Sequence, residues 1–426
     1  MKGLTLNRPH AATAAAAGGS VPVAAPPKPE QVPGSAAVQR LSALFSRATA
    51  VPAVVSLVVI AVFFQSQSHY FLSPTNLSNL AVQVTIVGSL ALGEVVILLL
   101  AEIDLSVGSV SGVCAAILGV LIANDGLPWY AAIAVMLACG ALMGMFQGFW
   151  VSYLGIPSFV VTLAGLLTFL GLQWQILGAQ GTLSIFDSHI AALTGTTLPP
   201  ETGWILGGLV AAGAVIVSAL RLRRQTRRGI VRAVSFPVLV AALVLGTVGV
   251  LNRANGVPTA FLVLVGCVLF GWWVTARTRP GRHLYATGGN AEAARRSGIR
   301  VKRIRFFAFA ISGLLAGLGG LLSVSFNGSA GTLTGGGTLL LTAIGAAVIG
   351  GTSLFGGEGT VWAALFGALI LAGVDNGLDL TDHSAPVKYI VEGIIVLLAV
   401  TVDTMLRRRG RAGRQLGGVD VGAAAA

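Results

Sequence analysis

The feature that most constrains this chain is a succession of apolar segments, most of them long enough to cross a lipid bilayer. A membrane-spanning helix needs about 20 apolar residues, and twelve such segments can be read along the 426 residues. Charged residues make up only 10% of the chain, whereas a soluble domain carries about 25%. The sequence therefore predicts an all-α integral membrane protein. The expected segments are 48–66, 78–100, 105–123, 128–152, 156–178, 203–220, 233–251, 258–276, 306–326, 337–352, 360–376 and 387–404.

Two Gly-rich joints, near 101–106 and 351–360, can be read as re-entrant breaks in place of full loops, which gives a bundle of about 10–12 transmembrane helices. Irregular backbone at membrane depth is tolerated where it is buried or lines a cavity. IDLSVGSVSGVCAAILGVLI (103–122) and TSLFGGEGTVWAALFGALIL (352–371) both run from such a break into a helix of small residues. We expect parallel repeats with cytosolic gate elements at the two joints, and plain tight turns are the alternative.

The basic residues predict the orientation of the bundle. If the N-terminus is cytosolic, 25 of the 27 Lys and Arg residues fall on the cytosolic side, and only Arg253 and Lys388 fall outside. Because cytosolic loops are enriched in Lys and Arg, both termini are expected to be cytosolic. This topology explains the net charge of +12 without a nucleic-acid partner. The expected regions are a disordered tail (1–47), a transmembrane domain (48–405) with a cytosolic loop (277–305), and a basic tail (406–426).

No enzyme motif is visible in the sequence. It has no P-loop, no metalloprotease His-Glu-x-x-His and no Gly-x-Ser-x-Gly elbow. The three cysteines lie within apolar segments, and the five histidines are scattered, so no metal site and no disulfide framework is predicted. These observations favour a transport or channel subunit with no cofactor of its own.

Three carboxylates fall in or near the expected spans: Glu94, Asp375 and Glu392. Ionisable residues within a membrane are costly and often belong to an ion or proton pathway. A stand-alone ion-coupled transporter is therefore one alternative, with Glu94 as a proton relay. The simpler interpretation is that Glu94 pairs with a polar group of a neighbouring helix. A structural or channel-like membrane protein is a third class.

The loop between the eighth and ninth segments is unusually basic, and it ends in YATGGNAEAARRSGIRVKRIR (285–305). Gly288 and Gly289 are expected to break the chain, Asn290 to cap a helix, and Gly298 to end it. The Ala residues between them favour a helix, and Glu292 suits its first turn. Such a two-turn helix is marginal alone in water. Its small residues suit a partner's groove; a capped linker beside anionic lipid is the alternative.

This loop resembles the cytoplasmic coupling loop of ATP-binding cassette importer permeases of the ribose, galactose, arabinose and xylose branch. The resemblance extends in order over most of residues 75–405 and is closest to D-xylose-type permeases. The pair of segments at 203–251 resembles an insertion that ribose-type permeases lack. One departure is that Ala101 and Glu102 stand where the branch usually has Gly-Gly. Further matching stretches are IDLSVGS (103–109), PSFVVTLAG (157–165), LNRANGVPT (251–259), GGTSLFGGEGTV (350–361) and DNGLDL (375–380).

The resemblance implies a sugar permease in a bacterial inner membrane, with N- and C-termini in the cytosol. Its implied partners are a second permease copy, a cytosolic ATPase that holds ATP and Mg, a periplasmic sugar-binding protein and membrane lipid. Neither catalysis nor a metal site is implied for this chain. The residues expected to couple to the ATPase are Gly289, Asn290, Glu292, Ala293, Ala294, Ser297 and Gly298. The expected gate or pathway residues are Asp104, Ser106, Ser158, Thr162, Asn327, Gly356, Asp375 and Asn376.

Overall fold

The computed structural model describes residues 50–222 and 227–417. All of these residues belong to one unit of the chain, Leu44–Ala426. The predictions for the tail 1–47 and for the residues after 417 lie outside the described part. The last expected segment continues as a helix to Gly417, which is past the boundary at 405 that the sequence suggested.

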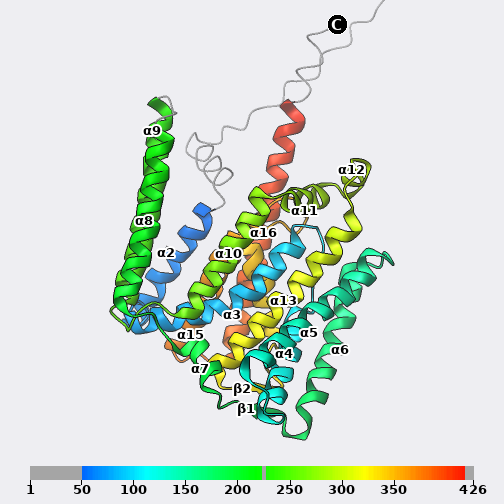
Figure 1. Cartoon of the computed structure of the whole chain (residues 1–426). Helices are drawn as coiled ribbons and strands as arrows, with labels where there is room; N and C mark the ends of the chain where they lie inside the picture. The colour runs from blue at the N-terminus through cyan, green and yellow to red at the C-terminus, as the bar shows by residue number, and fades with distance from the viewer. Residues whose placement is uncertain (1–49, 223–226, 418–426) are drawn as a thin grey trace, which may run out of the picture. The chain divides into compact units, whose positions relative to one another are not determined.

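Every one of the twelve apolar segments coincides with a helix, because a chain in lipid must satisfy its backbone hydrogen bonds internally. Figure 1 shows these helices running along one common direction. They are α2 (Ala50–Gln67), α3 (Pro74–Leu98), α4 (Val107–Ala123), α5 (Trp129–Ser152), α6 (Ser158–Leu177), α8 (Pro200–Leu222), α9 (Arg227–Leu251), α10 (Thr259–Arg277), α13 (Val301–Asn327), α14 (Gly337–Ile349), α15 (Trp362–Leu380) and α16 (Ala385–Gly417).

Seven helices in the described residues are long and apolar enough to cross a membrane: α3, α5, α6, α8, α10, α13 and α15. Four further apolar helices, α2, α4, α14 and part of α9, are shorter. At 1.5 Å per residue the 13 residues of α14 span about 20 Å, less than a bilayer core of about 30 Å. This finding confirms the all-α membrane bundle, whereas ten to twelve full crossings remains a prediction.

The centre of the bundle is formed by α3 and α13, which are mostly buried. Small residues allow α13 to approach its neighbours closely. A Cβ at Gly144 of α5 would overlap the Phe309 carbonyl oxygen of α13, and one at Gly313 would overlap the Gly140 carbonyl oxygen. Helices α5 and α13 are therefore in direct backbone-to-backbone contact.

One end of the bundle carries short elements of the connection between α6 and α8. Strand β1 (Thr182–Ser184) pairs antiparallel with β2 (Ser329–Gly331), and Thr182 lies opposite Gly331. Between β1 and α8 lies the short helix α7 (Ser188–Gly195), whose N-cap Asp187 accepts from the backbone N–H groups of His189 and Ile190. This connection is therefore an ordered structure.

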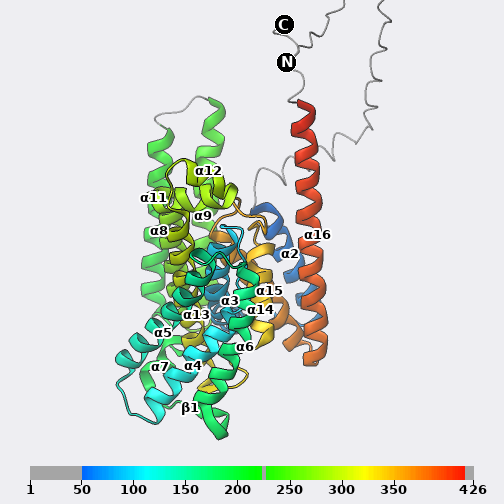
Figure 2. The same cartoon turned by 90° about the vertical axis from the view of Figure 1, so that its right-hand side faces the viewer.

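The opposite end of the bundle carries two further helices, α11 (Arg279–Gly289) and α12 (Ala291–Arg296). Both views place them away from β1 (Figure 1; Figure 2). The irregular segment between α3 and α4 and that between α14 and α15 reach this same end. We call them the first break (99–106) and the second break (350–361).

Candidate functional site

The two breaks and helix α11 meet at one point, which we call the three-segment junction. The backbone N–H of Gly357 in the second break donates to the carbonyl oxygen of Leu99 in the first, at 3.0 Å. The phenol of Tyr285 on α11 donates to the Gly359 carbonyl oxygen at 2.9 Å. Burial raises the pKa of this phenol further above neutral pH, where a tyrosine is a hydrogen-bond donor already. The junction thus joins three distant stretches of sequence.

Gly288 lies at the centre of the three-segment junction. A Cβ at this position would overlap the Leu99 carbonyl oxygen and would lie 2.8 Å from the Gly357 nitrogen. Only glycine allows the end of α11 to touch both breaks at once. The sequence interpretation of Gly288 and Gly289 as a chain break was wrong, because both residues belong to α11.

Helix α11 forms in a stretch that contains Gly and Pro because its N-terminus is capped and one of its faces is buried. The Thr278 hydroxyl caps its N-terminus by accepting from the Gly281 N–H at 3.4 Å, and a proline occupies the first turn. Leu284 and Thr287 are buried, whereas Arg282 is exposed. Packing therefore stabilises a helix that composition alone disfavours.

Helix α12 follows directly and has the cap expected from the sequence. The Asn290 side chain accepts from the Ala293 N–H at 2.9 Å. Glu292 forms ion pairs with Arg295 at 2.8 Å and with Arg296 at 3.2 Å. Gly298 ends the turn with a φ of +83°, in the left-handed region that glycine favours.

The residues predicted to couple to a partner differ in their exposure. Gly289, Asn290, Glu292, Ala293, Ser297 and Gly298 are exposed, whereas Ala294 is 4% exposed and packs within the chain. Beside them lies a groove of about 380 Å³. Its lining is strongly basic and consists of Tyr153, Arg295, Ile299, Arg300, Val301, Lys302 and Arg303. Together these residues form a positively charged surface that projects from the bundle.

The first break is also tied to α13 by charge. Glu102 and Arg305 form an ion pair at 2.9 Å, and their side chains are 11% and 28% exposed. Glu102 is the residue that departs from the pattern of the resembling permeases. Its neighbour Ala101 has a φ of +61°, a conformation that costs a non-glycine residue about 1–2 kcal/mol. The pair holds this strained backbone against the second turn of α13.

We expect Glu102→Gln to weaken this attachment, because Arg305 would lose the charge that balances it. The unfolding free energy should fall by about 1–3 kcal/mol, and the unfolding temperature in detergent should fall with it. The control is Glu201→Gln, at an exposed site on α8. Equal melting of Glu102→Gln and wild type would contradict the structural role. Restored melting in the charge-swapped variant E102R/R305E would support it.

Below the junction lies a buried polar network that includes four of the predicted gate residues. The Ser106 hydroxyl donates to Asp104 at 2.6 Å, and the Ser158 hydroxyl accepts from the Ile103 N–H at 3.2 Å. Thr162 donates to the Ile103 carbonyl oxygen at 3.2 Å. The structure therefore brings Asp104, Ser106, Ser158 and Thr162 together around the first break.

Two members of this network were missed by sequence reasoning. Gln147 of α5 donates to the Ser106 hydroxyl at 2.7 Å, and Ser312 of α13 donates to Asp104 at 3.2 Å. Both residues lie within long apolar segments, where a single polar residue has no spacing pattern to reveal its partner. Glu94 is buried nearby, and neither of its carboxylate oxygens has a hydrogen-bond partner in the described structure. The expected pairing of Glu94 with a neighbouring helix was wrong.

The remaining predicted residues lie in other places. Gly356 belongs to the three-segment junction, where its φ is +77°. Asn327 is exposed at the opposite end of the bundle and donates to the Ser323 carbonyl oxygen. The Asp375 carboxylate oxygen Oδ1 lies 3.7 Å from Nζ of Lys388, and the two form an ion pair. The eight candidates therefore do not form one site.

Asn376 is buried and exchanges two hydrogen bonds with Asn76 of α3, at 2.8 and 3.1 Å. We expect Asn376→Leu to lower the unfolding free energy by about 1–2 kcal/mol, because the Asn76 amide would be left buried without this partner. The double variant N76L/N376L should lose less than the sum of the two single variants. Additive losses, measured by thermal unfolding in detergent, would contradict direct coupling.

The chain with this multi-pass helical bundle, two breaks and projecting basic helix is similar to known transport proteins. The family described as "Branched-chain amino acid transport system / permease component" matches residues 76–400. The xylose transport system permease protein of Escherichia coli K12 is 40% identical over 365 residues, which are 84% of this chain and 92% of that protein.

Two further relatives are also sugar transport permeases. The xylose transport system permease protein of Haemophilus influenzae is 38% identical over 357 residues, 83% of this chain and 95% of that protein. The ribose import permease protein of E. coli K12 is 30% identical over 350 residues, 82% of this chain and 92% of that protein. No solved structure matches this chain.

The class defined by the fold and the comparisons is that of multi-pass membrane transport proteins. Within this class, the chain belongs to the family of transport-system permease components. It is a transport subunit and not an enzyme, and the branch suggested by the sequence motifs is confirmed.

Proposed function

We propose that this permease admits D-xylose or a closely related monosaccharide through the bacterial inner membrane, driven by ATP hydrolysis on a separate subunit. The observation that carries the proposal is the 40% identity to a xylose transport permease over 84% of the chain. The lower identity of 30% to a ribose import permease favours xylose over ribose. Both termini are proposed to be cytosolic, from the distribution of basic residues.

A permease component of this kind works with an ATPase and a sugar-binding protein. In our proposal two copies of this chain pair around the pathway, and each ATPase contacts the exposed residues of α12. ATP and Mg are held by the ATPase, and this chain holds no cofactor. The basic groove beside α12 favours an acidic surface on the ATPase.

In this proposal, movement of the ATPase is transmitted to the first break by direct contacts between neighbouring segments. A push on α12 would pass to α11, and from Gly288 to both breaks at the three-segment junction. A second route runs from α12 through the start of α13 to Arg305, and by its ion pair to Glu102. Both routes end at the first break, beside the buried network of Asp104 and Ser106.

The network around the first break suits a gate for neutral, hydroxyl-rich molecules. Its carboxylate, hydroxyl and amide groups can exchange hydrogen bonds with one another or with sugar hydroxyls. Weak contact suffices here, because the binding protein supplies the affinity for the sugar. Asn327, Asp375 and Asn376 lie outside this network, and we assign them helix-capping and helix-pairing roles.

The test is uptake of labelled xylose by cells that contain this chain with its ATPase and binding protein as the only xylose importer. We expect ATP depletion to abolish uptake and a protonophore, with ATP maintained, to leave it intact. An excess of unlabelled ribose should compete less than unlabelled xylose. Uptake that survives ATP depletion and collapses with the protonophore would instead establish the ion-coupled alternative.

A further inference from the structure

The hairpin of α8 and α9 stands partly apart from the rest of the bundle (Figure 1). The two helices pack on each other, and α9 also contacts α3. At the β1 end a hydrogen bond joins the two segments that flank the hairpin. The Leu198 N–H, before α8, donates to the Val257 carbonyl oxygen, after α9, at 2.8 Å. Much of the remaining hairpin surface is exposed and apolar, including Leu209 and Leu243. In a membrane this surface must be covered by lipid.

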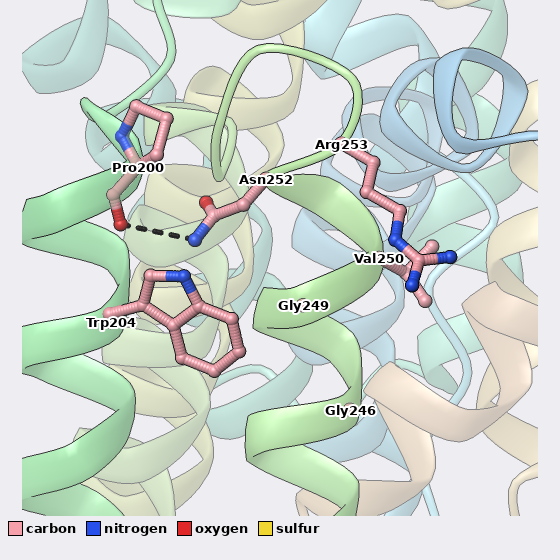
Figure 3. Close-up of a pocket in the computed structure, with 7 residues that line it drawn as sticks. All are labelled: Pro200, Trp204, Gly246, Gly249, Val250, Asn252 and Arg253. Carbon is pink, nitrogen blue, oxygen red and sulfur yellow. Dashed lines mark hydrogen bonds between the residues drawn. The ribbon is translucent and has the colours of Figure 1, made fainter.

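A groove of about 540 Å³ lies at the β1 end of this hairpin. Figure 3 shows Trp204 and Arg253 on either side of the face of α9 that carries Gly246 and Gly249. Gly246 leaves the groove open, because a Cβ there would meet no atom within 4 Å. At Gly249 the Trp204 ring lies close by, and a Cβ would come within 3.3 Å of it. Asn252 fixes the rim by donating to the Pro200 carbonyl oxygen at 3.0 Å. Val250 completes the lining.

The groove continues along α9 as an apolar stripe. Leu239, Leu243, Gly246 and Val250 recur at helical spacing and lie on one face. Leu239 is 56% exposed and Leu243 is 60% exposed. Arg253 lies in the turn that follows α9, two residues after the helix ends at Leu251. An apolar track that ends in one cation matches a lipid acyl chain that ends in a phosphate.

The charge at this end of the bundle singles out Arg253. Within the described ranges, Arg253 and Lys388 are the basic residues (Lys or Arg) at the β1 end. Lys388 pairs with Asp375 and Asp379, whereas Arg253 forms none of the ion pairs found in the described residues. Its guanidinium is exposed and lies on the other side of α9 from the Trp204 ring (Figure 3). Guanidinium groups bind phosphate oxygens well.

We propose that this groove is a binding site for a membrane phospholipid. Arg253 binds the phosphate, and one acyl chain lies over Gly246, Leu243 and Leu239. The bound lipid would fill the open side of the hairpin and hold it in the membrane at a fixed tilt. The proposal concerns the hairpin alone and is independent of which sugar is carried.

The test is native mass spectrometry of the full chain, purified and delipidated in detergent, with added phosphatidylglycerol or diacylglycerol of the same acyl chains. We expect Arg253→Gln to weaken phosphatidylglycerol binding about tenfold, as loss of a charge-assisted hydrogen bond would, and to leave diacylglycerol binding unchanged. Gly246→Leu, which fills the groove, should weaken both. The matched control is Gly208→Leu on α8, where a Cβ also meets nothing within 4 Å and which lies outside the groove.

Unchanged phosphatidylglycerol binding in both Arg253→Gln and Gly246→Leu would overturn the proposal. An equal loss in Gly208→Leu would also overturn it, because the effect would then belong to the hairpin surface in general. Complete competition by inorganic phosphate at millimolar concentration would assign Arg253 to free phosphate and not to a lipid. Melting curves of all three variants in detergent check that each one folds.

Discussion

Replacing Gly288 by valine is expected to abolish uptake almost completely while the chain still enters the membrane. The new side chain would overlap the Leu99 carbonyl oxygen and crowd the Gly357 nitrogen, so α11 could no longer touch both breaks. Overpacking of this kind costs about 1–3 kcal/mol or more, and here it falls on the contact that we propose links the ATPase to the gate. The measurement is labelled-sugar uptake, normalised to the amount of chain in the membrane.

The control for Gly288→Val is Gly266→Val on α10. A Cβ at Gly266 meets no atom within 4 Å, and the residue is exposed on the bundle surface. Uptake in this variant should stay close to wild type. If Gly288→Val imported sugar at the wild-type rate, the three-segment junction would have no part in transport.

Gly298→Pro is the second substitution for which we expect a large loss of uptake. Proline fixes φ near −65°, whereas Gly298 has a φ of +83° and its N–H donates to the Arg295 carbonyl oxygen at 3.0 Å. The turn that ends α12 must therefore change shape, at a local cost above about 1 kcal/mol. Because α12 projects from the bundle, membrane insertion and melting should remain close to wild type. Uptake and ATPase co-purification should both fall at least about tenfold, equivalent to 1.4 kcal/mol.

The companion variant Gly298→Asn separates shape from composition at this position. Asparagine tolerates the left-handed region better than other non-glycine residues, so α12 should keep its shape and uptake should be largely retained. A loss in Gly298→Asn as deep as that in Gly298→Pro would mean that the glycine acts through lack of a side chain and not through its φ.

The helices of the bundle could be predicted because the bilayer requires long apolar segments whose backbone hydrogen bonds are made within the segment. All twelve apolar segments are helices in the structure. The cap of α12 was equally predictable, because Asn290 and Gly298 act on neighbouring residues only. Helix caps of this kind can be predicted from the sequence because they depend on neighbouring residues.

Features that depend on tertiary packing were not predictable in the same way. Helix α11 was missed because Pro280 and three glycines disfavour a helix, and only burial of Leu284 and Thr287 reveals why it forms. Gln147 could not be linked to Ser106, nor Ser312 to Asp104, since these partners lie far away in the sequence, in the first break. Glu102 was recognised as a departure, but its partner Arg305 is visible only in the folded chain.

The central claim is that α12 is the contact through which a separate ATPase drives this permease. The most direct measurement is purification from native membranes in mild detergent, followed by mass spectrometry of the bound proteins. We predict that a P-loop ATPase co-purifies with the wild-type chain and is lost when residues 290–298 are replaced by a Gly/Ser linker. An ATPase retained by the linker variant, or absent from the wild type in several detergents, would contradict the claim.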